Sequence, residues 1–179
     1  MIILATPRLI LRRWRESDRE PFARMNADPR VMEFFPHPLS RSDSDAAVDR
    51  INAHFDAHGF GLYAAELSAN HRFIGFIGLA VPAFAAGFTP CVEIGWRLSP
   101  EYWGRGLATE GAREVARFAF TGLGLDSLVS FTVPANRRSR RVMEKIGMIR
   151  DPAEDFDHPN LAPGHPLRRH VLYRLHKMD

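Results

Sequence analysis

The segment from Val92 to Glu110 constrains the fold more than any other part of the chain. Its first residues alternate between apolar side chains and polar or small ones, which is the two-residue period of a β-strand. Gly104 and Gly106 then interrupt the chain just before a helix predicted from Leu107. Bare backbone N–H groups and the positive end of a helix dipole attract anions, phosphate above all. The segment therefore predicts a phosphate-bearing ligand beside a strand that carries one carboxylate, Glu93.

Two common phosphate-binding motifs do not fit this loop. A P-loop ends in Gly-Lys-Ser/Thr, whereas the only lysines of the chain are Lys145 and Lys177. A dinucleotide fingerprint needs a third small residue where Thr109 stands, and an acidic residue after the next strand. Asp126 has about the right spacing but precedes the apolar run that it would have to follow. The sequence excludes a P-loop NTPase and disfavours a dinucleotide-binding domain.

A third motif matches the loop better. WGRGLA, residues 103–108, resembles the Q/R-x-x-G-x-G/A pyrophosphate loop of GNAT-type N-acetyltransferases, with Trp103 in place of Gln or Arg. Other segments, in the right order, resemble the RimJ/RimL-like branch of that family, which acetylates the N-termini of ribosomal proteins. These segments are Thr6–Arg12, Ser17–Asp18, Asp28–Met32, Asn136–Ser139 and Glu144–Met148. The resemblance thus covers nearly the whole chain.

This resemblance implies a mixed α+β fold, the GNAT acyl-CoA N-acyltransferase fold. Its central twisted sheet is mostly antiparallel, with one parallel strand pair splayed around the cofactor and helices on both faces. The strands that start near Val92 and Leu128 are expected to be the parallel pair, because a right-handed crossover joins them. With 179 residues, 45% of them hydrophobic and 25% charged, the chain is expected to form a single GNAT N-acetyltransferase domain over residues 1–179.

Periodicity and capping residues predict the individual elements. Helices are expected over residues 19–26, 29–35, 40–58, 107–120 and 137–146. Strands are expected over 8–14, 60–67, 72–80, 92–98, 128–133 and 169–175, with a hairpin turn at 68–71 and a long loop over 151–167. Gly59 is expected to end the 40–58 helix in the C-cap role.

The resemblance implies acetyl-coenzyme A as the cofactor, with its pantetheine arm on the first parallel strand and its pyrophosphate on the glycine loop. The expected cofactor-binding residues are Trp96, Arg97, Leu98, Trp103, Gly104, Arg105, Gly106, Leu107, Ala108, Thr109, Asn136 and Arg141. Asn136 is equally expected to cap the helix that follows it, and both roles can hold at once. Arg141 belongs to a basic cluster over residues 137–141. That cluster is either a solvated helix end or a contact for the 3′-phosphate of coenzyme A or an acidic partner such as ribosomal RNA.

Acetyl transfer to an amine needs a neutral amine and a proton for the departing thiolate. An α-amino group has a pKa near ~8, so a fair fraction is neutral at cell pH, whereas a lysine amine at ~10.4 costs about 4 kcal/mol to deprotonate. Glu93, acting through a water, is the candidate base, and its alternative is a strand residue that faces solvent. Many relatives carry a Tyr as the acid where this chain has Met143. Ser139 is therefore the candidate acid, with helix capping as its alternative.

Phe34, Phe35 and Phe84 lie in segments that flank the acceptor side in similar proteins, so they are candidate substrate-binding residues, although aromatic residues more often belong to the core. The expected acceptor is a protein N-terminal α-amine. The alternatives are a small amine (an amino acid, a polyamine or an antibiotic) and an acyl-CoA-binding sensor without turnover. No metal site is expected, because the histidines near the C-terminus are irregularly spaced. Direct DNA binding is not expected either.

The remaining expectations concern location and assembly. The lone Cys91 rules out an internal disulfide and suits a reducing compartment. No apolar run approaches the ~20 residues of a membrane helix, and the first residues do not resemble a signal peptide. A cytoplasmic protein without a membrane partner is expected, and the resemblance allows a homodimer.

Overall fold

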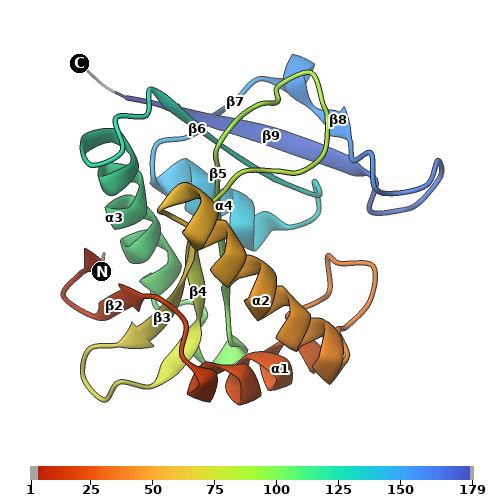
Figure 1. Ribbon diagram of the computed structural model, residues 1–179. Coiled ribbons are helices and arrows are strands. Elements are labelled where there is room, and N and C mark those ends of the chain that lie inside the picture. Colours follow the sequence, from red (N-terminus) through yellow and green to blue (C-terminus); the bar gives the residue numbers. More distant parts are fainter. Residues whose placement is uncertain (1–3, 178–179) are drawn as a thin grey trace.

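The computed structural model describes residues 4–177, which contain a nine-stranded mixed sheet (Figure 1). The strands are β1 Leu4–Ala5, β2 Leu9–Arg12, β3 Leu62–Leu67, β4 Phe73–Ala80, β5 Glu93–Leu98, β6 Ser127–Thr132, β7 Ile149–Arg150, β8 Phe156–Asp157 and β9 Arg169–His176. Neighbours follow the order β1-β2-β3-β4-β5-β6-β9-β7, and β8 pairs with β9. Every pair is antiparallel except β5 with β6, so the predicted sheet with one parallel pair is confirmed.

Four α-helices of the described chain pack on this sheet (Figure 1). They are α1 Arg19–Ala27, α2 Arg41–His58, α3 Leu107–Thr121 and α4 Arg137–Lys145, with short 3-10 turns at Glu16–Asp18, Pro100–Tyr102 and Pro152–Glu154. Phe22 of α1 packs edge-on against Phe76 of β4, whereas Ile77, the next residue of β4, lies against Gly111 of α3. Because successive strand residues point to opposite faces, α1 and α3 cover opposite faces of the sheet.

Local capping explains why α2 has the length that the sequence predicts. The Ser40 side chain accepts a hydrogen bond from the backbone N–H of Asp43 at 3.1 Å, which starts the helix. Gly59 ends it with a φ of 75°, in the left-handed region that glycine adopts at little cost. The predicted C-cap is confirmed.

The parallel strands β5 and β6 meet only where β5 begins. Glu93 pairs with Val129, and the backbone N–H of Val129 donates to the carbonyl of Val92 at 2.9 Å. Beyond this point β5 continues to pair with β4, and β6 with β9, but not with each other. The inner edge of β5 from Ile94 to Leu98 is therefore left without a strand partner, and the predicted splay is confirmed.

A buried ionic cluster ties β2, β3 and the turn before α1 together. The Arg12 Nε donates to the Glu66 carboxylate at 2.6 Å, and its two terminal nitrogens donate to the Asp18 carboxylate at 2.7 and 2.9 Å. Burial alone would raise the pKa of Glu66, but hydrogen bonds from His71 and Arg12 hold that pKa below its usual value. All three charged groups are almost inaccessible to solvent, and each has its partner.

The helix predicted over residues 29–35 is wrong. The carboxylate of Asp28 accepts the backbone N–H of Arg30 at 2.9 Å, and the carbonyl of Asp28 accepts the N–H groups of Val31 and Met32. The chain therefore forms consecutive turns, which bury Val31 and Met32 in the core. An Asp side chain that bonds its own following backbone competes with helix formation in this way.

Small elements at the sheet edges and in the tail were not predicted. β1 and β7 contain two residues each, too few for a detectable alternation. The expected loop over 151–167 includes a 3-10 turn and the two-residue strand β8. Within residues 4–177, no helix has both the length and the apolar character to cross a membrane.

Candidate functional site

The glycine loop lies between the end of β5 and the start of α3. Gly104 and Gly106 have φ values of 73° and 76°, which side chains other than glycine disfavour. A Cβ on Gly104 would meet nothing within 4 Å, and one on Gly106 would meet only the Arg8 Nη2 atom at 3.6 Å. Gly106 is the N-cap of α3 and offers no capping side chain, so the first N–H groups of the helix are available to an anion. The loop is thus an open cradle of the kind predicted for a pyrophosphate.

Arg8, which the sequence interpretation did not select, holds this loop in place. Its Nε donates to Glu110 at 2.6 Å and its Nη1 donates to the carbonyl of Arg105 at 2.9 Å. Glu110 also accepts from the hydroxyl of Thr6 at 2.6 Å, so the loop and the first turn of α3 are fastened to the N-terminal segment. Half of the Arg8 side chain is exposed beside Gly106, and its guanidinium is ion-paired with Glu110 at 2.6 Å. The sequence feature that could have identified Arg8 is its position in the Thr6–Arg12 motif.

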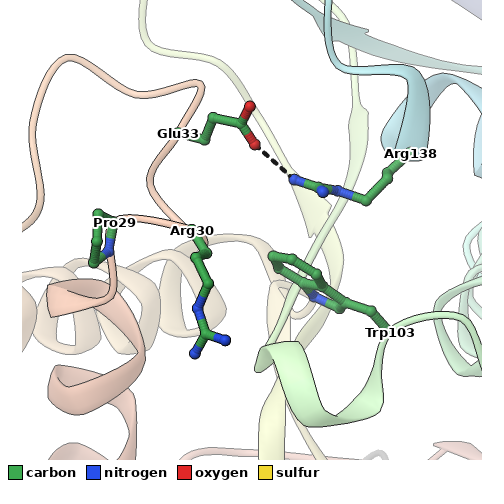
Figure 2. A pocket seen from close by; sticks show the side chains of 5 residues that line it. All are labelled: Pro29, Arg30, Glu33, Trp103 and Arg138. Carbon is green, nitrogen blue, oxygen red and sulfur yellow. Dashed lines mark hydrogen bonds and ion pairs between the residues drawn. The ribbon is translucent and has the colours of Figure 1, made fainter.

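Trp103 forms one wall of a shallow hollow next to the loop (Figure 2). Its indole Nε1 donates to the carbonyl of Leu98, the last residue of β5, at 2.7 Å. The guanidinium of Arg138, from the start of α4, stacks over its ring at 4.4 Å and donates to Glu33 at 2.8 Å. The hollow has a volume of about 370 Å³ and is completed by Pro29 and Arg30. Trp103 therefore replaces the family's Gln or Arg by a residue that fixes the loop to β5.

Glu93 lies at the point where β5 and β6 part. Its carboxylate Oε1 is 3.8 Å from where a Cβ on Gly95 would be, and nothing else lies within 4 Å of that position. Glu93 is half-buried rather than fully exposed. Burial disfavours the charged form and raises the pKa of Glu93 to about 8. A carboxyl group with such a pKa is suited to exchanging a proton near neutral pH.

Arg97 shares a face of β5 with Glu93 and Gly95, because the three alternate along the strand. Its Nη1 donates to the Asn26 side chain at 2.8 Å, and the ring of Phe35 covers the guanidinium at 4.2 Å. Burial lowers the pKa of Arg97 to about 10. The neighbours Trp96 and Leu98 point to the other face and pack on the core.

The hydrogen bonds at the start of α4 show which of Asn136 and Ser139 caps the helix. The Asn136 side chain accepts the backbone N–H of Ser139 at 3.2 Å and donates to the Thr132 hydroxyl at 3.0 Å. Asn136 is therefore the helix cap, as predicted, and helix capping by the Ser139 side chain is excluded. Within residues 4–177 the Ser139 hydroxyl has no hydrogen-bond partner, and the residue is half-buried. Met143, at the position of the usual Tyr, is buried.

The candidate substrate-binding residues lie in two separate regions of the structure. Phe35 is 40% exposed and Phe34 is half-buried, both in the turns between α1 and α2. Phe84 instead joins an aromatic cluster between the β4–β5 loop and the tail, with ring centroids 4.6–6.2 Å apart from its neighbours. These neighbours are Phe88, Phe131, Phe156 and His158. Arg141 is exposed, whereas Arg140 donates to the Tyr173 hydroxyl and the Pro134 carbonyl.

Comparisons with known proteins identify the family. The acetyltransferase (GNAT) domain model matches residues 8–149. The FsC-acetyl coenzyme A-N(2)-transacetylase of Aspergillus fumigatus is 34% identical over 81% of this chain, and the match spans 64% of that protein's length. The uncharacterized N-acetyltransferase YnaD of Bacillus subtilis is 28% identical over 83% of each chain. An acetyltransferase structure from Agrobacterium tumefaciens superposes with a TM-score of 0.80 at 30% identity, over 99% of this chain and 95% of the other. The chain therefore belongs to the GNAT acetyltransferase family, whose enzymes use acetyl-coenzyme A.

Proposed function

We propose that this protein is an acetyl-coenzyme A-dependent N-acetyltransferase that acts on an α-amine. One observation carries the proposal: the carboxyl group of Glu93 lies where β5 and β6 part, next to the open space over Gly95. The raised pKa of Glu93, about 8, is close to that of an α-amine, near ~8. A lysine amine would need a stronger base.

The residues at the splay fit the cofactor in shape and in chemistry. The open cradle over Gly104 and Gly106, with Arg8 beside it, suits a pyrophosphate. The unpaired edge of β5, from Ile94 to Leu98, offers backbone groups to an amide-containing arm such as pantetheine. Within that stretch the carbonyl of Leu98 is already engaged by Trp103.

In the proposed reaction, two residues of the protein transfer protons. When bound, acetyl-coenzyme A supplies the activated acetyl group as a thioester. Glu93 accepts a proton from the acceptor amine, directly or through a water, and so leaves the nitrogen lone pair free to attack. The hydroxyl of Ser139, without a partner in the described chain, is placed on α4 to donate a proton to the departing sulfur. Because a thiolate is a reasonable leaving group, this second task adds less to the rate than the first.

The acceptor that the sequence favours is a protein N-terminus. This preference rests on the resemblance of Thr6–Arg12 and Asp28–Met32 to the RimJ/RimL-like branch. A small amine is the second candidate, because the Aspergillus relative is named for transfer to an N(2) position. An N-terminal α-amine has a pKa near ~8, whereas a more basic small amine costs more to deprotonate and makes a greater demand on Glu93.

A thiol-release assay with acetyl-coenzyme A tests the proposal. The acceptors are a panel of N-terminal peptides, free amino acids and polyamines, each tested with the wild-type protein and with Glu93→Gln. We expect turnover with α-amines, little with polyamines, and a loss of about 100-fold in kcat for Glu93→Gln at unchanged acetyl-coenzyme A affinity. Binding of acetyl-coenzyme A without thiol release from any acceptor would instead indicate a sensor protein and contradict the proposal.

A further inference from the structure

Arg97 has an unused hydrogen-bonding edge. Its Nη1 donates to Asn26, but its Nε is buried and has no hydrogen-bond partner. Nε and Nη2 together form the side of a guanidinium that binds a carboxylate through two parallel hydrogen bonds. Within residues 4–177, neither nitrogen donates to an oxygen and no carboxylate forms an ion pair with Arg97. Buried arginines are otherwise almost always paired.

The surroundings of Arg97 hold its charge in place without neutralising it. The guanidinium lies 4.2 Å from the ring centre of Phe35 and 5.4 Å from that of Phe76. Aromatic faces stabilise a cation but leave the N–H groups at its rim free. Asn26 is itself fixed by a hydrogen bond from its Nδ2 to the Ser44 hydroxyl at 2.9 Å. The guanidinium is thus held in one orientation, with Nε and Nη2 free of hydrogen-bond partners within residues 4–177.

The position of Arg97 links it to the proposed acceptor site. Glu93, Gly95 and Arg97 follow one another on the same face of β5, so the Cα atoms of Glu93 and Arg97 lie about 13 Å apart. The space over Gly95 between them is open. Phe35, which covers Arg97, belongs to the turns whose residues Pro29, Arg30 and Glu33 line the hollow beside Trp103. An acceptor with its amine at Glu93 extends along this face toward Arg97.

We propose that Arg97 binds a carboxylate of the acceptor, so that the enzyme selects amines that carry an acidic group a few bonds from the reacting nitrogen. The inference rests on the proposed function and narrows its substrate class. The carboxylate is either that of a free α-amino acid or that of an acidic side chain near a peptide N-terminus. Both present the same planar pair of oxygens to the unused edge of the guanidinium.

Matched acceptor pairs test the inference. The first pair is L-alanine and L-alaninamide, which differ only in the α-carboxylate and are compared per concentration of neutral amine, and the second is two C-terminally amidated tripeptides with Asp or Asn at position two. In the wild-type protein we expect kcat/KM to be about 10- to 100-fold higher for the acidic member of at least one pair, and the pair that shows it identifies the source of the carboxylate. Equal kcat/KM within both pairs would overturn the inference.

Two variants separate recognition from a structural role. Arg97→Met should abolish the preference, because kcat/KM for the acidic acceptor falls at least about tenfold more than kcat/KM for the neutral one. Asn26→Asp, which keeps the shape of Asn26, gives Arg97 an internal counter-ion and should also remove the preference. A fall of equal size for both members of a pair, in either variant, would mean that Arg97 only supports the fold.

A binding measurement keeps the two proposals apart. In the presence of coenzyme A, the N-acetylated acidic acceptor should raise the Tm of the wild-type protein and not that of Arg97→Met. If no amine releases thiol but this shift is seen, the proposed catalytic function fails and the carboxylate site stands. If thiol is released but the product shifts both Tm values equally, the carboxylate site fails and the catalytic function stands.

Discussion

Arg12 and Arg97 are both enclosed by protein, but their surroundings differ. Arg12 donates hydrogen bonds to two buried carboxylates, those of Asp18 and Glu66, and its pKa is raised despite its burial. Arg97 meets aromatic rings and one amide, and its pKa is lowered to about 10. The same contrast separates Glu66, whose pKa is lowered, from Glu93, whose pKa is raised to about 8.

The contrast separates the buried charges that stabilise the fold from the charges that are proposed to bind or react with substrate. A buried charge with its partners fixes the strands that supply it. A buried charge without them lowers the stability of the fold and is tolerated where a ligand completes its contacts. Glu93 and Arg97, which have no ion-pair partner in the described chain, lie on β5, and the uncapped N–H groups after Gly106 lie at the start of α3, the next α-helix. The paired cluster lies outside β5, on β2, β3 and the turn before α1.

The largest expected effect is on stability. Arg12→Met removes the guanidinium that bridges two buried carboxylates and should lower the free energy of unfolding by about 3–5 kcal/mol. Arg97→Met leaves only the Asn26 amide oxygen without its donor and should change that free energy by less than about 1 kcal/mol. Urea denaturation of both variants measures the difference. Equal losses would remove the distinction between the two arginines.

The second-largest expected effect is on the binding of acetyl-coenzyme A at the glycine loop. Gly106→Val places a branched side chain where the backbone faces the cofactor and should weaken acetyl-coenzyme A binding by about 100-fold in calorimetry. Gly124→Val is the matched control, because Gly124 also has a positive φ, 68°, and open space around its Cβ position. It should lose similar stability but bind the cofactor normally. Normal binding by Gly106→Val would exclude the loop as the pyrophosphate site.

Glu93 should make the unliganded protein less stable as the pH rises. Between its ordinary pKa of 4.5 and the folded value of about 8, the unfolded chain releases a proton that the folded chain keeps. Stability therefore falls with pH in this window, by up to about 1.4 kcal/mol per pH unit, and levels off above pH 8. Glu93→Gln lacks this dependence. Urea denaturation from pH 5 to 9 measures the difference, and a constant gap between the two proteins would mean that Glu93 ionises normally.

The smallest expected effect is at Ser139. Ser139→Ala removes a hydroxyl without a partner in the described chain and should lower kcat by less than about tenfold, with stability and acetyl-coenzyme A affinity unchanged. A loss above about 100-fold would mean that proton donation to sulfur limits the rate. An unchanged kcat would mean that the thiolate leaves without this acid.

Local patterns predicted the parts of the fold that local interactions determine. The alternation over β5, the Gly59 cap and the glycine-rich turn before α3 each depend on neighbouring residues, and each was predicted correctly. The turns after Asp28 were missed, because a side-chain contact to the next backbone groups replaced the helix that Asp-Pro favours.

Contacts between distant segments were beyond prediction from the sequence. Arg8 and Glu110 are 102 residues apart, and Asn26 and Arg97 are 71 apart. Glu93 and Arg97 were selected by their strand and by resemblance, for a base and for a backbone contact. That neither side chain has an oppositely charged partner within residues 4–177 became visible only with the elements that pack around them, because the absence of a counter-ion is a property of the folded chain.

The pH dependence of kcat, measured at saturating acetyl-coenzyme A and α-amine acceptor, tests the central claim most directly. The account predicts that kcat of the wild-type protein rises with an apparent pKa near 8, and that Glu93→Gln has a much lower kcat without this ionisation. An identical profile and rate in Glu93→Gln would contradict the claim that this carboxyl group accepts the proton of the amine.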